Sequence, residues 1–199
     1  MKKLTVFASG QGSNFEAIFK KIKSKELKAH IALVVSNNPK AKIIETAKKN
    51  KIEVFLYTKD VPEKELLKKI KEVKTDYIIL AGYLKRISSK MIKKYPNKIL
   101  NIHPALLPAF GGEGYYGLHV HEAVIDSGVK YSGPTIHFVD ERYDHGAIIA
   151  QKAIPVLETD NAQSLQKRVL KEEHKLFWKA IKSVVENKLK VQGKRVLSK

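Results

Sequence analysis

The alternation of two kinds of segment constrains the fold of this chain most. Between Lys3 and about Asp160, short apolar runs typical of strands alternate with longer stretches of helical character. This order is typical of an α/β domain with a largely parallel sheet, because a helix must return the chain to the start of each next strand. We expect strands at Leu4–Ala8, His30–Ser36, Glu53–Tyr57, Tyr77–Ala81, Ile99–His103, Thr135–Val139 and Ile148–Val156.

Helix signals fall between these strands. Phe15, Ile18, Phe19 and Ile22 have the i, i+3, i+4, i+7 spacing of an amphipathic helix, so a βαβ unit opens the chain. Further helices are expected around Ile43–Ala47, from Val61-Pro62-Glu63 onward, and over Asp160–Asn187, with room for a final hairpin around Gln192-Gly193.

Length and composition indicate one globular domain over residues 1–199, with 43% apolar and 29% charged residues. The chain has no cysteine, which excludes disulfides. Its N-terminus leads directly into a strand-like run, and its apolar runs are far shorter than the roughly 20 residues that cross a bilayer. We therefore expect a cytoplasmic protein with no membrane role.

The formal net charge of +18 raises the possibility of nucleic-acid binding. However, only four of the 38 basic residues are arginine, and the lysines lie in short clusters along the whole chain. This distribution favours a solvated surface over a dedicated nucleic-acid groove. The charge still increases the encounter rate with a small anionic substrate.

Gly10-Gln11-Gly12-Ser13-Asn14 separates the first predicted strand from the first predicted helix. Backbone N–H groups and the helix dipole make such a position an anion site, to which Ser13 and Asn14 add side-chain donors. The alternative is that Ser13 or Asn14 is only the helix N-cap.

Asn101-Ile102-His103-Pro104 ends the fifth predicted strand. Side chains alternate across a strand, so Asn101 and His103 share one face, and ligands of open α/β sheets bind beyond the carboxyl ends of the strands. The segment from Asp140 to Gly146 is a polar loop between two apolar strands, and one of its acids could pair with His103. Such a carboxylate would raise the pKa of the imidazole, although these acids could also simply cap the turn.

Glu173 lies on the apolar stripe of the last predicted helix, four residues after Val169 and four before Phe177. A carboxylate is seldom buried without a partner. Either it binds a ligand or it forms a structural ion pair with a nearby lysine.

Together these motifs resemble the phosphoribosylglycinamide formyltransferase family. The resemblance covers nearly the whole chain and rests on GQGSN at 10–14, LAGYL at 80–84, NIHPALLP at 101–108, GLHVHEA at 117–123, the Asp144-x-Gly146 loop and the pair Glu173-His174. It implies a single-domain, Rossmann-like α/β formyltransferase fold with a mostly parallel central sheet and helices on both faces. Residues 1–100 would be the mononucleotide-binding half and residues 101–199 the catalytic and folate-binding half.

The resemblance also implies a reaction, the transfer of a formyl group from 10-formyltetrahydrofolate, as cosubstrate, to the amine of glycinamide ribonucleotide in purine synthesis. Asn101, His103 and Asp144 match the catalytic residues of the family, and no metal is needed. The substrate phosphate would lie over Gly12, Ser13 and Asn14, with the other end of the ribonucleotide near Glu173. The folate would contact Asn101 and two segments, which are Leu84, Lys85, Arg86 and Ile87, and Asp140, Glu141, Arg142, Tyr143 and Asp144.

Some positions depart from the family pattern. The loop from Pro108 to Gly117 is longer than in many members and is either a mobile flap or a surface insertion. Arg86 stands where an aliphatic residue is common, and Lys59 is the nearest counterpart of a family arginine near the folate tail. His119-Val120-His121 could suggest a metal site, but no third ligand is evident.

Three other functions remain as alternatives. Methionyl-tRNA formyltransferase and formyltetrahydrofolate hydrolase share the Asn, His and Asp pattern, but they usually carry a further domain for which this sequence has no room. A non-catalytic, basic nucleic-acid-binding module is the third. Small-molecule substrates without a specific nucleic acid are the expected partners, and a homodimer is compatible with the sequence.

Overall fold

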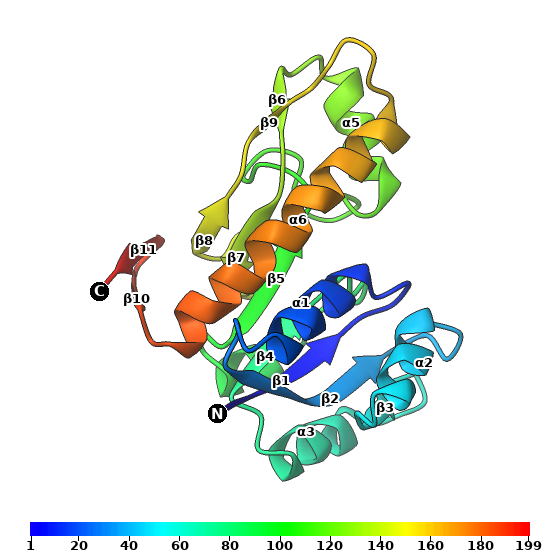
Figure 1. The fold of residues 1–199 in the computed structure, drawn as a ribbon, viewed down its shortest axis with the longest axis vertical. Helices are drawn as coiled ribbons and strands as arrows, with labels where there is room; N and C mark the ends of the chain where they lie inside the picture. The colour runs from blue at the N-terminus through cyan, green and yellow to red at the C-terminus, as the bar shows by residue number, and fades with distance from the viewer. The chain divides into compact units, whose positions relative to one another are not determined.

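The structure is a computed structural model that describes all residues, 1–199. The chain divides into two compact units, Met1–Leu100 and Asn101–Lys199 (Figure 1). Its strands are hydrogen-bonded in the order β3-β2-β1-β4-β5-β7-β8, and two further two-stranded sheets pair β6 with β9 and β10 with β11. The predicted α/β class is therefore confirmed.

The first unit is a parallel βαβ arrangement. Its elements are β1 (Lys2–Phe7), α1 (Ser13–Lys23), β2 (Ala29–Ser36), α2 (Lys42–Lys49), β3 (Val54–Leu56), α3 (Glu63–Glu72), β4 (Tyr77–Leu80) and α4 (Ser89–Lys94). β1 pairs in parallel with both β2 and β4, and β2 pairs in parallel with β3. The expected parallel sheet of this half is thus present, with strand ends within one or two residues of those predicted for β1 and β2.

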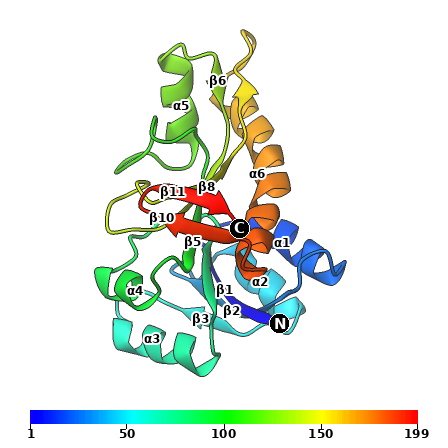
Figure 2. The ribbon, with the colours of Figure 1, turned by 90° about the vertical axis from the view of Figure 1, so that its left-hand side faces the viewer.

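The connections place the helices of this unit on both faces of its strands. From β1 to β3 the chain moves outward in one direction, and it then returns past β1 to β4. Because such crossovers are right-handed, the helices of the two directions must cover opposite faces. Figure 2 shows this arrangement, with α1 and α2 on one side of the strands and α3 and α4 on the other.

The second unit contains the remaining elements. After β5 (Ile99–His103), which begins just before the unit boundary, come α5 (Leu118–Asp126), β6 (Tyr131–Ser132), β7 (Thr135–Phe138), β8 (Ile148–Gln151), β9 (Ile154–Pro155), α6 (Ala162–Val185), β10 (Leu189–Gln192) and β11 (Arg195–Ser198). β7 and β8 are antiparallel, and α5 packs on α6 around Val124, Leu165 and Val169. The long last helix and the hairpin after it agree with the prediction.

One predicted strand is wrong as a single element. The segment Ile148–Val156 is broken into β8, which pairs with β7, and β9, which pairs with β6. The break coincides with a close backbone approach at Gly133, where an added Cβ would lie 1.9 Å from the carbonyl oxygen of Lys152. Two short antiparallel pairs therefore replace one long strand. The sequence predicted neither β6 nor the close approach of Gly133 to Lys152.

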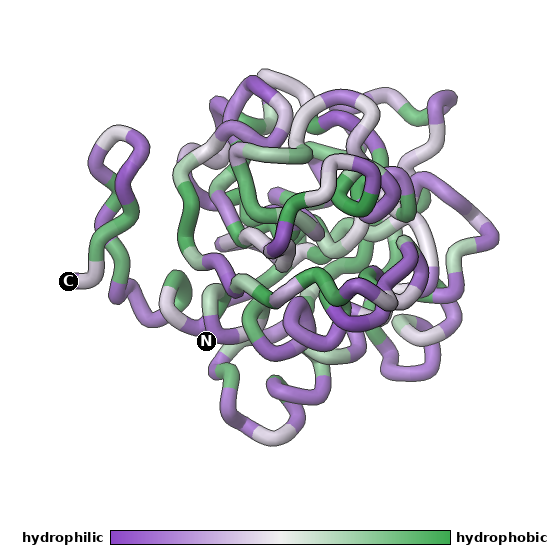
Figure 3. Tube along the Cα trace, turned by 90° about the horizontal axis from the view of Figure 1, so that it is seen from above, coloured by the Kyte–Doolittle hydropathy of each residue, from purple (hydrophilic) through white to green (hydrophobic).

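Hydrophilic residues recur along the whole Cα trace and are separated by hydrophobic stretches (Figure 3). They do not gather in one segment, in agreement with the scattered lysines of the sequence. No helix combines the length and apolar character that a membrane span requires.

Candidate active site

Asn101 and His103 lie at the end of β5, as the alternation of side chains along the strand predicts. His103 is buried, with 3% of its surface exposed. Its Nε2 is 2.7 Å from the carbonyl oxygen of Phe110. Since a carbonyl only accepts hydrogen bonds, Nε2 carries a hydrogen and Nδ1 is the nitrogen that gains or loses the second proton.

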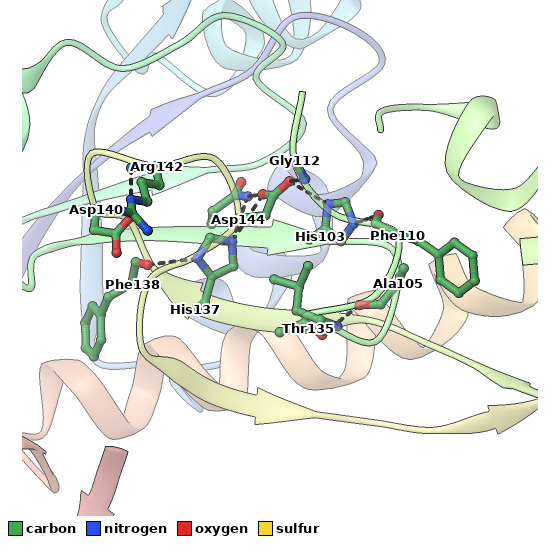
Figure 4. A network of polar contacts seen from close by, with 12 residues as sticks. His103, Ala105, Phe110, Gly112, Thr135, His137, Phe138, Asp140, Arg142 and Asp144 are labelled. Carbon is green, nitrogen blue, oxygen red and sulfur yellow. Dashed lines mark hydrogen bonds and ion pairs between the residues drawn. The ribbon is translucent and has the colours of Figure 1, made fainter. Parts of the chain in front are cut away.

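Asp144 is the acid of the polar loop that meets this imidazole. Its Oδ2 is 3.5 Å from Nδ1 of His103 and accepts a 3.0 Å hydrogen bond from the backbone N–H of Gly112. Its Oδ1 accepts a 3.4 Å hydrogen bond from Nδ2 of Asn101. The expected proximity of a loop carboxylate to His103 is therefore found, and Figure 4 shows the two side chains facing each other.

His137 belongs to the same cluster but was not identified from the sequence. On β7, its Nδ1 donates to the carbonyl oxygen of Phe138 at 2.8 Å, while its Nε2 is 3.1 Å from Nδ2 of Asn101 and 3.5 Å from Oδ1 of Asp144. Neutral His137 can thus accept from Asn101, and charged His137 can donate to Asp144. The available signal was the alternation of polar Thr135 and His137 in an otherwise apolar strand.

Burial dominates the electrostatics of His103. It lowers the pKa of the imidazole, while Asp144 and the Phe110 carbonyl raise the pKa and His137 lowers it further. The net pKa lies below the usual value, so the expectation that a nearby carboxylate would raise it is wrong for the resting site. The interaction with Asp144 has the expected sign, but desolvation of the imidazolium outweighs it.

The carboxyl of Asp144 is shifted in favour of its charged form. Burial alone would raise its pKa, but the contacts with His137, His103 and the Gly112 N–H outweigh burial and lower it. The site therefore combines a carboxyl whose pKa is lowered, which favours its ionised form, with an imidazole whose pKa is also lowered, which favours its neutral form.

In the first unit, helix α1 begins at Ser13 with Gly12 as its N-cap, and no side chain caps it. The alternative that Ser13 or Asn14 is the N-cap is therefore wrong. Gly12 has a φ of 80°, and an added Cβ would lie 2.9 Å from Cβ of Ile43. First-turn N–H groups have no acceptor within a helix, so this uncapped start suits an anion.

Ser9 holds the strand ends of the first unit together, which the sequence did not reveal. Its Oγ donates to Oδ1 of Asn37 at 2.6 Å and accepts from the N–H of Leu84 at 2.9 Å, and its carbonyl accepts from Nδ2 of Asn38 at 3.2 Å. The loops after β1, β2 and β4 are thus joined through one serine.

The other predicted contact residues differ in exposure. Leu84, Lys85, Arg86 and Lys59 are exposed, whereas Ile87 is buried. In the second unit, Glu141, Arg142 and Tyr143 are exposed, and Asp140 and Asp144 are half-buried. Glu173 is buried on α6, with 8% exposure, as its place on the apolar stripe predicts.

The two histidines at the start of α5 do not share a site. His119 is exposed and its Nδ1 is 3.0 Å from Oε2 of Glu122, whereas His121 is 1% exposed. No group of three or more histidine or acidic side chains is arranged to hold a metal ion.

Comparisons with known proteins agree with one another. The model of a family described as formyl transferase matches residues 2–181. Phosphoribosylglycinamide formyltransferase of Bacillus subtilis (strain 168) is 40% identical over 191 residues, which are 93% of this chain and 95% of that protein. A chloroplastic protein of the same name from Vigna unguiculata is 45% identical over 194 residues, 94% of this chain, and the chain spans 62% of its length.

A solved structure is also similar over the whole chain. The crystal structure of glycinamide ribonucleotide transformylase 1 from Symbiobacterium toebii aligns with a TM-score of 0.92 and 33% identity, covering 100% of this chain and 94% of that one.

Proposed function

The chain belongs to the formyl transferase family, among the phosphoribosylglycinamide formyltransferases, and we propose that it transfers the formyl group of 10-formyltetrahydrofolate to the amine of 5'-phosphoribosylglycinamide. The reaction is a step of purine synthesis. One observation carries the proposal, the meeting of Asn101, His103 and Asp144 at the end of β5.

The chemistry of these three side chains suits the transfer. The amine attacks the formyl carbon, and the carbonyl oxygen becomes an oxyanion in a tetrahedral intermediate. The amide of Asn101 and an Nδ1–H of His103 can donate to that oxygen. The developing negative charge favours the imidazolium, which offsets the burial that keeps His103 neutral at rest.

Asp144 completes the transfer as a proton relay. It accepts the proton that the attacking nitrogen loses, and a proton is delivered to the departing folate nitrogen as its bond to the formyl carbon breaks. The balance is one N–C bond formed, one N–C bond broken and one proton moved. No redox partner is required.

Binding of the two reactants involves other residues. We assign the ribonucleotide phosphate to the start of α1, at Gly12, Ser13 and Asn14, and a further substrate contact to Glu173. The folate contacts the Leu84–Ile87 segment and the Asp140–Asp144 loop. The uncapped N-terminus of α1 and the buried carboxylate of Glu173 support these assignments.

The proposal is tested with one formyl donor and three acceptors. Purified protein is incubated with 10-formyltetrahydrofolate and either glycinamide ribonucleotide, initiator methionyl-tRNA or water alone. We expect folate release that depends on glycinamide ribonucleotide and yields formylated ribonucleotide. Transfer only to tRNA, or equal folate release in water alone, would replace the proposal with one of the two related activities.

A further inference from the structure

The first half of the loop from Pro108 to Gly117 contains Phe110–Gly112, a segment that is anchored by a side chain and has an unusual backbone conformation. The side chain of Phe110 packs against the cluster of Val124, Leu165 and Val169 from α5 and α6. Its φ of 53° lies in the left-handed region, which is uncommon for a bulky residue other than glycine. The segment is thus fixed to the core of the second unit.

The backbone of the same segment contacts both His103 and Asp144. The Phe110 carbonyl oxygen accepts from Nε2 of His103 at 2.7 Å, and two residues later the N–H of Gly112 donates to Oδ2 of Asp144 at 3.0 Å. Both contacts are visible in Figure 4. Neither requires a side chain of the loop, so the sequence pattern alone gives no sign of them.

Gly111, between these two residues, has no room for a side chain. An added Cβ would lie 2.4 Å from Cδ2 of Leu107 and 3.2 Å from Cβ of Asp144. The terminal methyl group of the buried Leu107 would have to shift, and the added Cβ would still press on the Cβ of Asp144. Gly111 therefore permits the segment to lie directly against Asp144.

Each of these contacts favours the charged form of the group that it touches. A carbonyl acceptor on Nε2 stabilises the imidazolium, and an N–H donor on Oδ2 stabilises the carboxylate. The carbonyl also fixes the imidazole so that Nδ1, the nitrogen that exchanges its proton, faces Asp144.

We propose that Phe110–Gly112 is a positioning segment that holds His103 and Asp144 in register for proton transfer. The inference rests on the proposed formyl transfer for its kinetic consequences. The second half of the loop has a different character, since Tyr115 and Tyr116 are 38% and 52% exposed. Only the first half of the loop contacts His103 and Asp144. In this proposal the loop is more than a surface insertion, because that half positions the reacting groups.

Gly111→Ala and Gly114→Ala form a matched pair of test variants. An added Cβ at Gly114 meets nothing within 4 Å, so this change introduces backbone strain in the same loop without pressing on Asp144. Gly111 does not have a positive φ, so alanine is compatible with its backbone. We expect Gly111→Ala to reduce kcat by about 10- to 100-fold with both KM values little changed, and Gly114→Ala to retain kcat.

A second readout does not depend on activity. NMR titration of the His103 ring, assigned with His103→Gln, should show a lower pKa in Gly111→Ala than in the wild type and no change in Gly114→Ala. If Gly111→Ala retained both the wild-type kcat and the wild-type His103 pKa, the positioning role would be refuted. If the wild type formylated no amine, the proposed function would fail, and the titration would still decide whether the segment positions His103.

Discussion

Asp144 combines backbone strain with charge. Its φ of 50° lies in the left-handed region, where a non-glycine residue is disfavoured by roughly 1 kcal/mol or more. In that conformation its carboxylate meets Asn101, His103 and the N–H of Gly112. These contacts stabilise the strained conformation. They place the carboxylate beside Asn101 and His103, the two side chains proposed to donate hydrogen bonds to the reacting oxygen.

The first prediction concerns His103 and Asp144. His103→Ala and Asp144→Asn should each lower kcat by about 10²–10⁴, the range for loss of a positioned proton-transfer group, while the fold stays intact. Steady-state kinetics with saturating substrates, together with circular dichroism, measure both effects. A variant that retained nearly wild-type turnover would remove that residue from the mechanism.

The second prediction concerns Glu173. If this buried carboxylate accepts hydrogen bonds from the ribonucleotide, Glu173→Gln should weaken that substrate by about 1–3 kcal/mol and spare the folate. Thermal unfolding and both KM values are measured on the one variant. A lower Tm with both constants unchanged would assign Glu173 a structural role instead.

At the scale of single residues, the sequence predicted which side chains lie near one another better than it predicted their pKa values. Strand alternation was sufficient to predict that Asn101 and His103 share one face of their strand. The polar loop then suggested Asp144 as a nearby acid. The same alternation at Thr135 and His137 was available but lay inside an apolar strand. The net pKa of His103 could not be predicted, because it depends on how completely the fold removes water from the imidazole.

Among the elements, α1 begins at Ser13, and its N-cap residue is Gly12, which provides no side-chain cap. Its first-turn N–H groups and its dipole therefore favour an anion at this end of the helix. Ser13 is half-buried and Asn14 is buried, so both are part of the helix start rather than of an exposed loop. The geometry agrees with an anion site formed mainly by backbone.

A third prediction follows from this helix. Phosphate contacts stabilise the bound ground state and the transition state about equally, so Ser13→Ala combined with Asn14→Ala should raise the KM for the ribonucleotide more than it lowers kcat. The KM for the folate is the internal control. An unchanged ribonucleotide KM in a stable double variant would place the phosphate elsewhere.

Elements with strong periodicity were predictable, and those fixed by tertiary contacts were not. The stripe of α6 and the spacing of α1 follow directly from the positions of apolar residues. By contrast, the break between β8 and β9 depends on the approach of Gly133 to Lys152, a contact between distant parts of the chain. The short α4 and the helix α5 were also missed.

On the scale of the whole molecule, the burial of His121 makes the free energy of unfolding depend on pH. His121 on α5 is 1% exposed, and its Nδ1 has no hydrogen-bond partner. Burial, with a smaller contribution from His103, lowers the pKa of His121 from 6.5 to about 4. The folded state therefore resists a proton that the unfolded chain accepts readily.

The fourth prediction is an acid-dependent loss of stability. Since the folded pKa lies below the unfolded value, the contribution of His121 is complete above pH 6.5 and declines as the pH falls toward about 4. The total loss corresponds to roughly 3 kcal/mol. Urea unfolding at about pH 7.5 and about pH 4.5 should show a smaller pH effect in His121→Gln than in the wild type. An equal loss in both proteins would exclude His121 as the cause.

The two exposed tyrosines of the loop after Phe110–Gly112 have a practical consequence. Because the sequence contains no cysteine, Tyr116→Cys would introduce a unique thiol on an exposed part of that loop. A fluorophore attached there would report on the loop without background labelling, and Gly111→Ala in the same labelled protein would show whether its signal depends on the contact with Asp144. The environment of the loop that supports the reacting groups can therefore be followed at one labelled position.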